Sequence, residues 1–143
     1  MEALSKWEQG IGRVALGTIF IFSGFGKLMA WSGTAAYSAS KGVPQILLVI
    51  ATALELLGGI SVVTGFKARW GALALLVFLV PVTLVFHGFW GLPADQQQAQ
   101  MVEFLKNLSI GGGLLIVLGR GAGACSIDAM RMRAGAPPLR TDS

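Results

Sequence analysis

Four polar side chains interrupt otherwise apolar stretches of this sequence, and their types are those that exchange protons or bind small molecules. Glu55 lies near the centre of the run LLVIATALELLGGISVVTG at residues 47–65, and Lys27, His87 and Asn107 lie in or at the end of three other apolar runs. A charge at the centre of a membrane helix costs roughly 2.5–3.5 kcal/mol on insertion scales. Glu55 can avoid this cost by taking up a proton or by pairing with a cation.

Two interpretations of these four residues follow. In the first, Lys27 is the preferred partner of Glu55 and His87 the second, while Asn107 hydrogen-bonds to either form, so that the cluster binds a small molecule or moves protons. In the second, a buried Lys–Glu pair only specifies how the helices assemble, and His87 is solvated. The residue types leave both interpretations open, and they assign no catalytic residue.

Three further residues are secondary candidates. Arg13 and Trp90 are interpreted as anchors at the membrane interface, and Glu103 lies one turn before Asn107 at the start of the fourth apolar run. No metal site or haem or iron–sulfur centre is expected, because one histidine and one cysteine supply too few ligands. Cys125 stands alone and therefore cannot form a redox pair within the chain.

The elements that hold these residues are predicted to be membrane helices. The 143-residue chain is 54% hydrophobic and 13% charged, whereas soluble chains are about 25% charged. Four apolar runs cover residues 11–31, 44–66, 70–89 and 101–119, each close to the ~20 residues that a helix needs to cross a bilayer. We therefore expect an all-α, integral membrane four-helix bundle at residues 1–128 and a basic, disordered tail at 129–143.

The distribution of basic residues predicts the orientation of this bundle. Eight of the eleven lysines and arginines fall on the side shared by the termini and the central loop, and only Lys27, Lys41 and Lys106 fall toward the other side. By the positive-inside rule, both termini are cytoplasmic. Glu55 then lies about 16 Å below the outer surface, from the helical rise per residue. The polar residues thus concentrate in the outer half of the bundle.

Glycines at helical spacing predict how the helices pack. Gly10, Gly17 and Gly24 recur every seven residues, and Gly58 and Gly59 follow Glu55 by one turn. Small residues let membrane helices approach closely. If these glycines face the bundle interior, Lys27 and Glu55 face it too.

Several segments in order resemble the DoxX family of small bacterial membrane proteins. They are RVALGTIFIFSGFGKL, GVP, ELLGGISVVTGFKARWGAL, HGFW and FLKNLSIGGGLLIVLGRGAGACSID, which together span roughly residues 10–128. The resemblance implies a four-helix bundle in the inner membrane. It also aligns family positions with residues of this chain, namely Arg13, Lys27, Glu55, His87 and Asn107.

The resemblance further implies a redox setting, because family members are associated with quinone-linked oxidation of sulfur compounds and with complexes that handle thiol and oxidative stress. The lone Cys125 departs from the cysteine pairs of similar quinone-reducing bundles. The leading hypothesis is therefore a redox-associated inner-membrane subunit that binds a quinone or similar molecule, with electrons from a partner. Whether the chain is itself an enzyme stays open.

The alternative is a non-enzymatic scaffold, assembly or partner-binding subunit. A transporter is less favoured, because inverted repeats are not evident in the sequence. In either case we expect contact with membrane lipid and either a protein partner or a homo-oligomer. Nucleic acid is not expected as a partner, because the basic residues are not interleaved with base-stacking aromatics.

Overall fold

The computed structural model describes residues 2–135, and it is all-helical over that range. Six helices follow one another along the chain: α1 (Glu2–Met29), α2 (Trp31–Ser40), α3 (Gln45–Thr64), α4 (Ala68–Phe86), α5 (Ala94–Arg120) and α6 (Ile127–Ala134). Four of them are long and apolar enough to cross a membrane, at Trp7–Met29, Gln45–Thr64, Ala68–Phe86 and Ala94–Arg120. The prediction of an all-α membrane protein with four spanning helices is confirmed.

The helix boundaries follow from local sequence chemistry. Pro44 precedes α3 and Pro93 precedes α5, where the missing proline N–H costs no helical hydrogen bond. Gly65 ends α3 in the left-handed conformation with φ 69°, which glycine adopts without steric cost. Helix α5 begins at Ala94, before the apolar run that starts at residue 101, because the polar segment ADQQQAQM is also helical.

The four long helices pack in the order α1, α3, α4, α5, with extensive contacts between successive members and slight contact between α1 and α5. Glycines allow the close approaches. A Cβ added to Gly59 of α3 would lie 3.2 Å from the Gly17 carbonyl oxygen of α1, and one added to Gly58 would lie 3.2 Å from the Gly71 carbonyl oxygen of α4. The predicted packing role of these glycines is therefore confirmed at the α1–α3 contact and extends to the α3–α4 contact.

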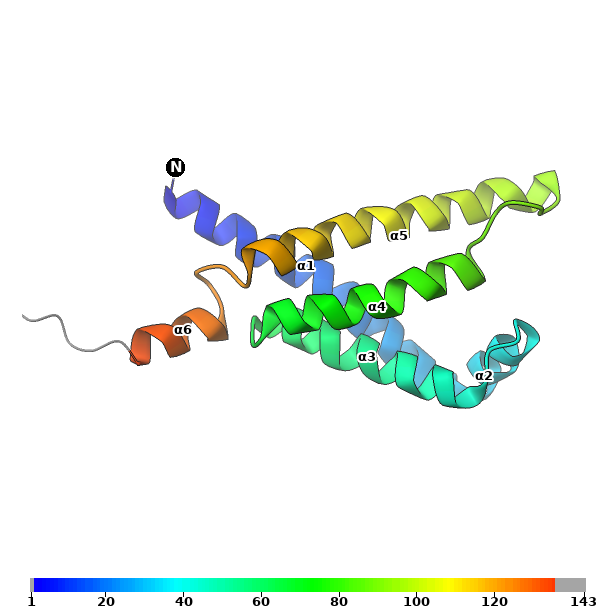
Figure 1. Cartoon of the computed structure of the whole chain (residues 1–143), viewed down its shortest axis with the longest axis horizontal. Helices are drawn as coiled ribbons and strands as arrows, with labels where there is room; N and C mark the ends of the chain where they lie inside the picture. The colour runs from blue at the N-terminus through cyan, green and yellow to red at the C-terminus, as the bar shows by residue number, and fades with distance from the viewer. Residues whose placement is uncertain (1, 136–143) are drawn as a thin grey trace, which may run out of the picture.

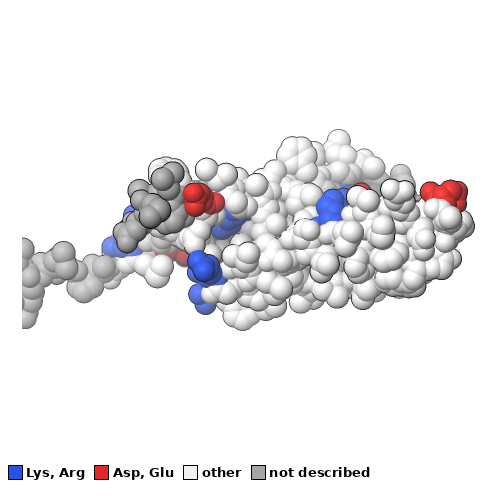
Figure 2. Space-filling model, turned by 90° about the horizontal axis from the view of Figure 1, so that it is seen from above, with Lys and Arg blue, Asp and Glu red and all other residues white. Residues whose placement is uncertain are grey.

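The outside of the bundle is apolar. Large hydrophobic side chains remain exposed on each of the four long helices, among them Phe22, Leu57, Val77 and Ile116. Uncharged atoms cover most of the face in Figure 2, and charged atoms gather mainly at its left end. A protein surface of this kind contacts the hydrocarbon of the bilayer.

Two short helices mark the ends of the molecule (Figure 1). Helix α2 lies at the end where α1 finishes and α3 begins, which we call the α2 end. Helix α6 lies at the opposite end, the α6 end, where α1 also begins. Because residues 127–134 are helical, the expected disordered tail is corrected for that part, and residues 136–143 lie outside the described residues.

Candidate functional site

A cavity of about 740 Å³ opens at the α2 end between the helices, and it contains most of the predicted polar residues. Its walls are mainly apolar side chains of α1, α3, α4 and α5, and α2 and the segment after it close one side. The acidic, basic, histidine and amide side chains in the lining are Lys27, Glu55, His87, Glu103, Lys106 and Asn107. All four primary candidates from the sequence therefore reach one cavity.

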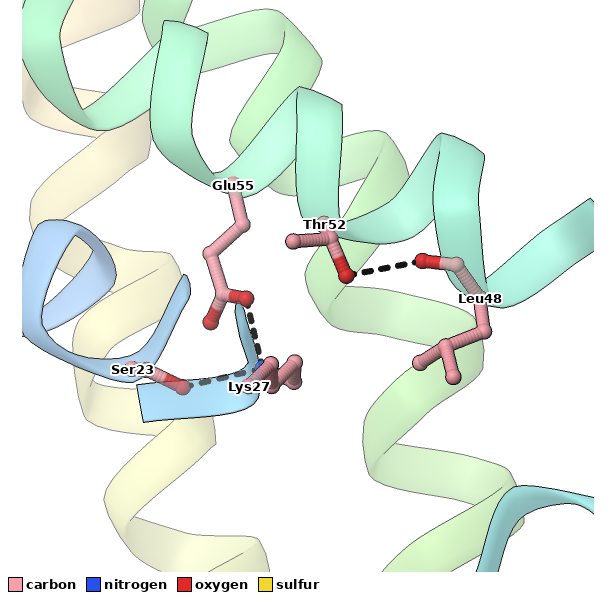
Figure 3. A network of polar contacts seen from close by, with 5 residues as sticks. All are labelled: Ser23, Lys27, Leu48, Thr52 and Glu55. Atoms are coloured by element: carbon pink, nitrogen blue, oxygen red, sulfur yellow. Dashed lines mark hydrogen bonds and ion pairs between the residues drawn. The ribbon is translucent and has the colours of Figure 1, made fainter. Parts of the chain in front are cut away.

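Lys27 and Glu55 form an ion pair between α1 and α3. The Lys27 Nζ lies 2.5 Å from Glu55 Oε2 and also donates to the hydroxyl of Ser23 at 2.9 Å. Figure 3 shows the Glu55 side chain directed from α3 toward Lys27 on α1. The Glu55 side chain is 3% exposed and that of Lys27 is 23% exposed. The carboxylate is thus buried and the ammonium group is partly exposed, and both side chains line the cavity.

Packing around the pair explains why this contact forms. A Cβ at Gly24 would lie 2.7 Å from Leu56, so only glycine lets α1 approach α3 at this level. The Lys27 ammonium lies 5.5 Å from the centre of the Phe78 ring of α4, within the range of a cation–π interaction. Lys27 therefore turns into the bundle instead of reaching along its surface.

Glu55 retains hydrogen-bonding capacity beyond this pair. Thr52, one turn earlier on α3, donates to the Leu48 carbonyl at 2.8 Å and not to the carboxylate (Figure 3). Within residues 7–135, Lys27 is the one hydrogen-bond donor to Glu55, and it reaches Oε2. The other carboxylate oxygen, Oε1, therefore remains available to accept from a ligand.

Asn107 bonds to α4 rather than to the ion pair. Its Nδ2 donates to Thr83 Oγ1 at 3.0 Å, and the Thr83 hydroxyl in turn donates to the Leu79 carbonyl at 2.7 Å. Both side chains are buried. These hydrogen bonds connect α5 to α4. They also hold the side-chain amide of Asn107 in one orientation.

His87 and Glu103 occupy the rim of the cavity. His87 ends α4, and its Nδ1 lies 3.0 Å from Gln100 Oε1 of α5. Glu103 pairs with Lys106 one turn further along α5, and both side chains are more than 40% exposed. The polar residues thus form separate pairs around one cavity, and the single connected cluster suggested by their types does not form among the described residues.

Two secondary candidates lie away from this cavity. Trp90 is 59% exposed and packs against Phe89 and Phe104, which suits an interface position. Arg13 is only 5% exposed and lies at the α6 end. Its guanidinium donates to the carbonyls of Val62, of Val63 at 2.6 Å and of Cys125 at 2.8 Å.

The interpretation of Arg13 as an interface anchor is therefore corrected. The last carbonyls of a helix lack intrahelical partners, and Arg13 satisfies two of them at the end of α3. The same side chain fixes the segment that leads into α6. The guanidinium group has five N–H donors and can therefore bond to two backbone segments at once.

Four site residues are not among those that the sequence singles out, namely Ser23, Phe78, Thr83 and Gln100. Hydroxyls within helices commonly bond to their own backbone, so their types alone carry little signal. Spacing offers one clue, because Ser23 precedes Lys27 and Thr83 precedes His87 by four residues, which places each pair on one helix face.

The comparison with protein families covers three of the four primary candidates. The DoxX family pattern matches residues 9–88, more than half of the chain, including Lys27, Glu55 and His87. The chain belongs to the DoxX family. The part of the site on α5, with Asn107 and Glu103, lies beyond the matched range.

Known proteins similar to this DoxX protein include two from Escherichia coli K12. The inner membrane protein YphA is 36% identical over 82% of this chain and 86% of its own length, and the inner membrane protein YqjF is 33% identical over 82% and 87%. A Surfeit locus protein 4 homolog from Schizosaccharomyces pombe is 34% identical over 82% of this chain, but over 35% of its own length. No solved structure matches significantly. The chain is accordingly a multi-pass inner membrane protein.

Proposed function

We propose that this DoxX-family protein is a ligand-binding subunit of the inner membrane whose cavity holds a small, mostly apolar molecule by one polar end. The observation that carries the proposal is the buried Lys27–Glu55 pair in the wall of an otherwise apolar cavity of about 740 Å³. Cavities that bind small molecules combine apolar walls with a few fixed polar groups. A quinone or a molecule of similar chemistry fits this description.

The pair supplies both kinds of hydrogen-bonding group that a quinone head needs. The Lys27 ammonium donates to a ligand oxygen, and Glu55 Oε1 accepts from a hydroxyl of the reduced form. Protons exchanged with the ligand would pass through these two side chains. The family resemblance supports a redox setting, and electrons would come from a partner protein, because the chain supplies no obvious redox group.

The packing of the helices supports access from the lipid phase. Helices α1 and α5 contact each other only slightly, with Leu16 close to Gly113. Toward the α2 end both helices line the cavity instead. This arrangement supports entry of a ligand from the bilayer between α1 and α5. By the positive-inside rule the cavity lies in the outer half of the membrane.

The proposal is tested by native mass spectrometry of the protein released from its own membrane, with lipid extraction of bound molecules. We expect a stoichiometric small molecule in the wild type and its loss in Glu55→Gln. The matched control is Glu8→Gln, which removes an exposed carboxylate outside the cavity lining and should leave the ligand bound. If both variants retain the ligand, Glu55 does not hold it and the ligand binds outside this cavity.

A non-enzymatic assembly role is the second candidate, because the Lys27–Glu55 pair joins two helices directly. It predicts that the released protein carries a specific partner chain and no small molecule. Glu55→Gln would then lower the abundance of the protein or of its complex. That pair of results would replace the ligand-binding proposal.

A further inference from the structure

A second cavity, of about 750 Å³, lies at the α6 end and has a different character. It is an open hollow lined by the α3–α4 loop, the first turn of α4, the end of α5, the segment at residues 121–126 and α6. Four basic side chains line it: Lys67, Arg69, Arg120 and Arg131. None of them belongs to the cavity at the α2 end.

Four cations face one carboxylate in the lining of this cavity, and none of the four forms an ion pair in the described part of the protein. In that part, ion pairs form only between Lys27 and Glu55 and between Lys106 and Glu103. The one carboxylate in the lining, Asp128, instead accepts from the backbone N–H groups of Lys67 and Ala68, at 2.9 and 3.3 Å.

Neutral partners hold two of the arginines in place. The Arg69 guanidinium donates to the Gly119 carbonyl at 3.2 Å, and the Arg131 guanidinium lies 4.8 Å from the centre of the Phe66 ring. Both contacts position a guanidinium and leave its charge intact. Planar guanidinium groups present paired donors that match the oxygens of a phosphate. The donors of this cavity therefore suit an anion with several oxygens.

An apolar stripe continues from this cavity along α4. Trp70 lines the cavity and is 70% exposed, and Leu73 and Val77 follow it at helical spacing with 39% and 60% exposure. The stripe runs from the basic end into the membrane span. A bound molecule with an anionic head and a hydrocarbon chain would contact both features, whereas free phosphate would contact only the first.

We propose that the cavity at the α6 end binds the phosphodiester headgroup of an anionic phospholipid, with its acyl chains along Trp70, Leu73 and Val77. This inference does not depend on the proposed function of the other cavity. Basic residues beside an anionic membrane surface each contribute to lipid binding, and removing one such charge is expected to weaken binding about fivefold.

The test measures phosphatidylglycerol binding to the delipidated, detergent-solubilised protein by native mass spectrometry, with phosphatidylcholine as the zwitterionic comparison. Arg120→Gln and Arg131→Gln each remove one charge from the cavity, and Lys41→Gln removes one exposed charge outside it. We expect each arginine variant to bind phosphatidylglycerol about fivefold more weakly than the wild type. Lys41→Gln should bind like the wild type, and circular dichroism checks that each variant keeps its helices.

Three results would overturn the inference. Equal retention of phosphatidylglycerol and phosphatidylcholine by the wild type would show that headgroup charge is not recognised. Equal binding by the arginine variants and Lys41→Gln would place the lipid elsewhere. Displacement of phosphatidylglycerol by inorganic phosphate at equal concentration would show a phosphate site to which the apolar stripe contributes nothing.

Discussion

At the scale of single residues, the Lys27–Glu55 pair of the site is a buried ion pair. Taking two charges out of water is costly, and their attraction offsets that cost only while both are present. The exposed Glu103–Lys106 pair on α5 differs, because solvent screens it and exposed pairs contribute about 0–1 kcal/mol. The two pairs thus provide an internal comparison between a buried and an exposed ion pair.

Lys27→Met should destabilise the protein by about 3–5 kcal/mol, because it leaves a carboxylate buried without its cation. The double variant Lys27→Met, Glu55→Leu should recover most of that loss. Thermal unfolding in detergent, followed by circular dichroism, measures both. Lys106→Met is the matched control and should change the stability by less than about 1 kcal/mol. An equal loss in Lys27→Met and Lys106→Met would contradict this account.

At the scale of helices, glycine positions decide which helices touch. Gly17 and Gly59 bring α1 against α3, and Gly58 and Gly71 bring α3 against α4. Gly112 on α5 has no neighbour within 4 Å of an added Cβ. Glycines within the spanning helices therefore differ in their roles. The role of each one depends on whether it faces a neighbouring helix.

Gly59→Ala should destabilise the bundle by about 1–3 kcal/mol through overpacking. The added Cβ would lie 3.0 Å from Ile21 Cγ1 and 3.2 Å from a backbone oxygen of α1 that cannot move alone. Gly112→Ala should leave stability unchanged or raise it, because alanine favours the helix. The same unfolding measurement compares them. A larger loss for Gly112→Ala would mean that the outer face of α5 is covered by another chain.

At the scale of the whole molecule, the two ends differ in charge and in the cavities they hold. The α6 end carries the basic cavity with four cationic side chains in its lining. The α2 end carries the cavity with the Lys27–Glu55 pair. From the positive-inside rule we expect the α6 end to lie in the cytoplasm.

Labelling of single cysteines tests this orientation in intact cells. In a Cys125→Ser background, Ser40→Cys and Gln98→Cys lie at the α2 end and should react with a membrane-impermeant maleimide. Arg133→Cys lies at the α6 end and should react only after the membrane is disrupted, because the reagent cannot cross the bilayer. The reverse pattern would invert the topology and place the ion-pair cavity in the cytoplasmic half.

The local properties of the sequence determined the spanning helices, because length and hydropathy of a segment suffice to place it in a bilayer. They also favoured Lys27 over His87 as the partner of Glu55, because a buried carboxylate needs a cation or a proton, and the structure confirms Lys27. The resemblance to the DoxX family, which depends on the order of several motifs, pointed to the same polar residues. These predictions depend on the properties of single segments or on the free-energy cost of an unpaired buried charge.

The pairing of the remaining polar side chains depends on the tertiary structure. Asn107 bonds to Thr83, His87 lies beside Gln100, and Arg13 is buried against the end of α3 instead of lying at the interface. The physical reason is that these contacts depend on the rotation of each helix about its axis and on the glycine contacts that set its distance from its neighbours. Neither quantity is encoded in the hydropathy of any one segment.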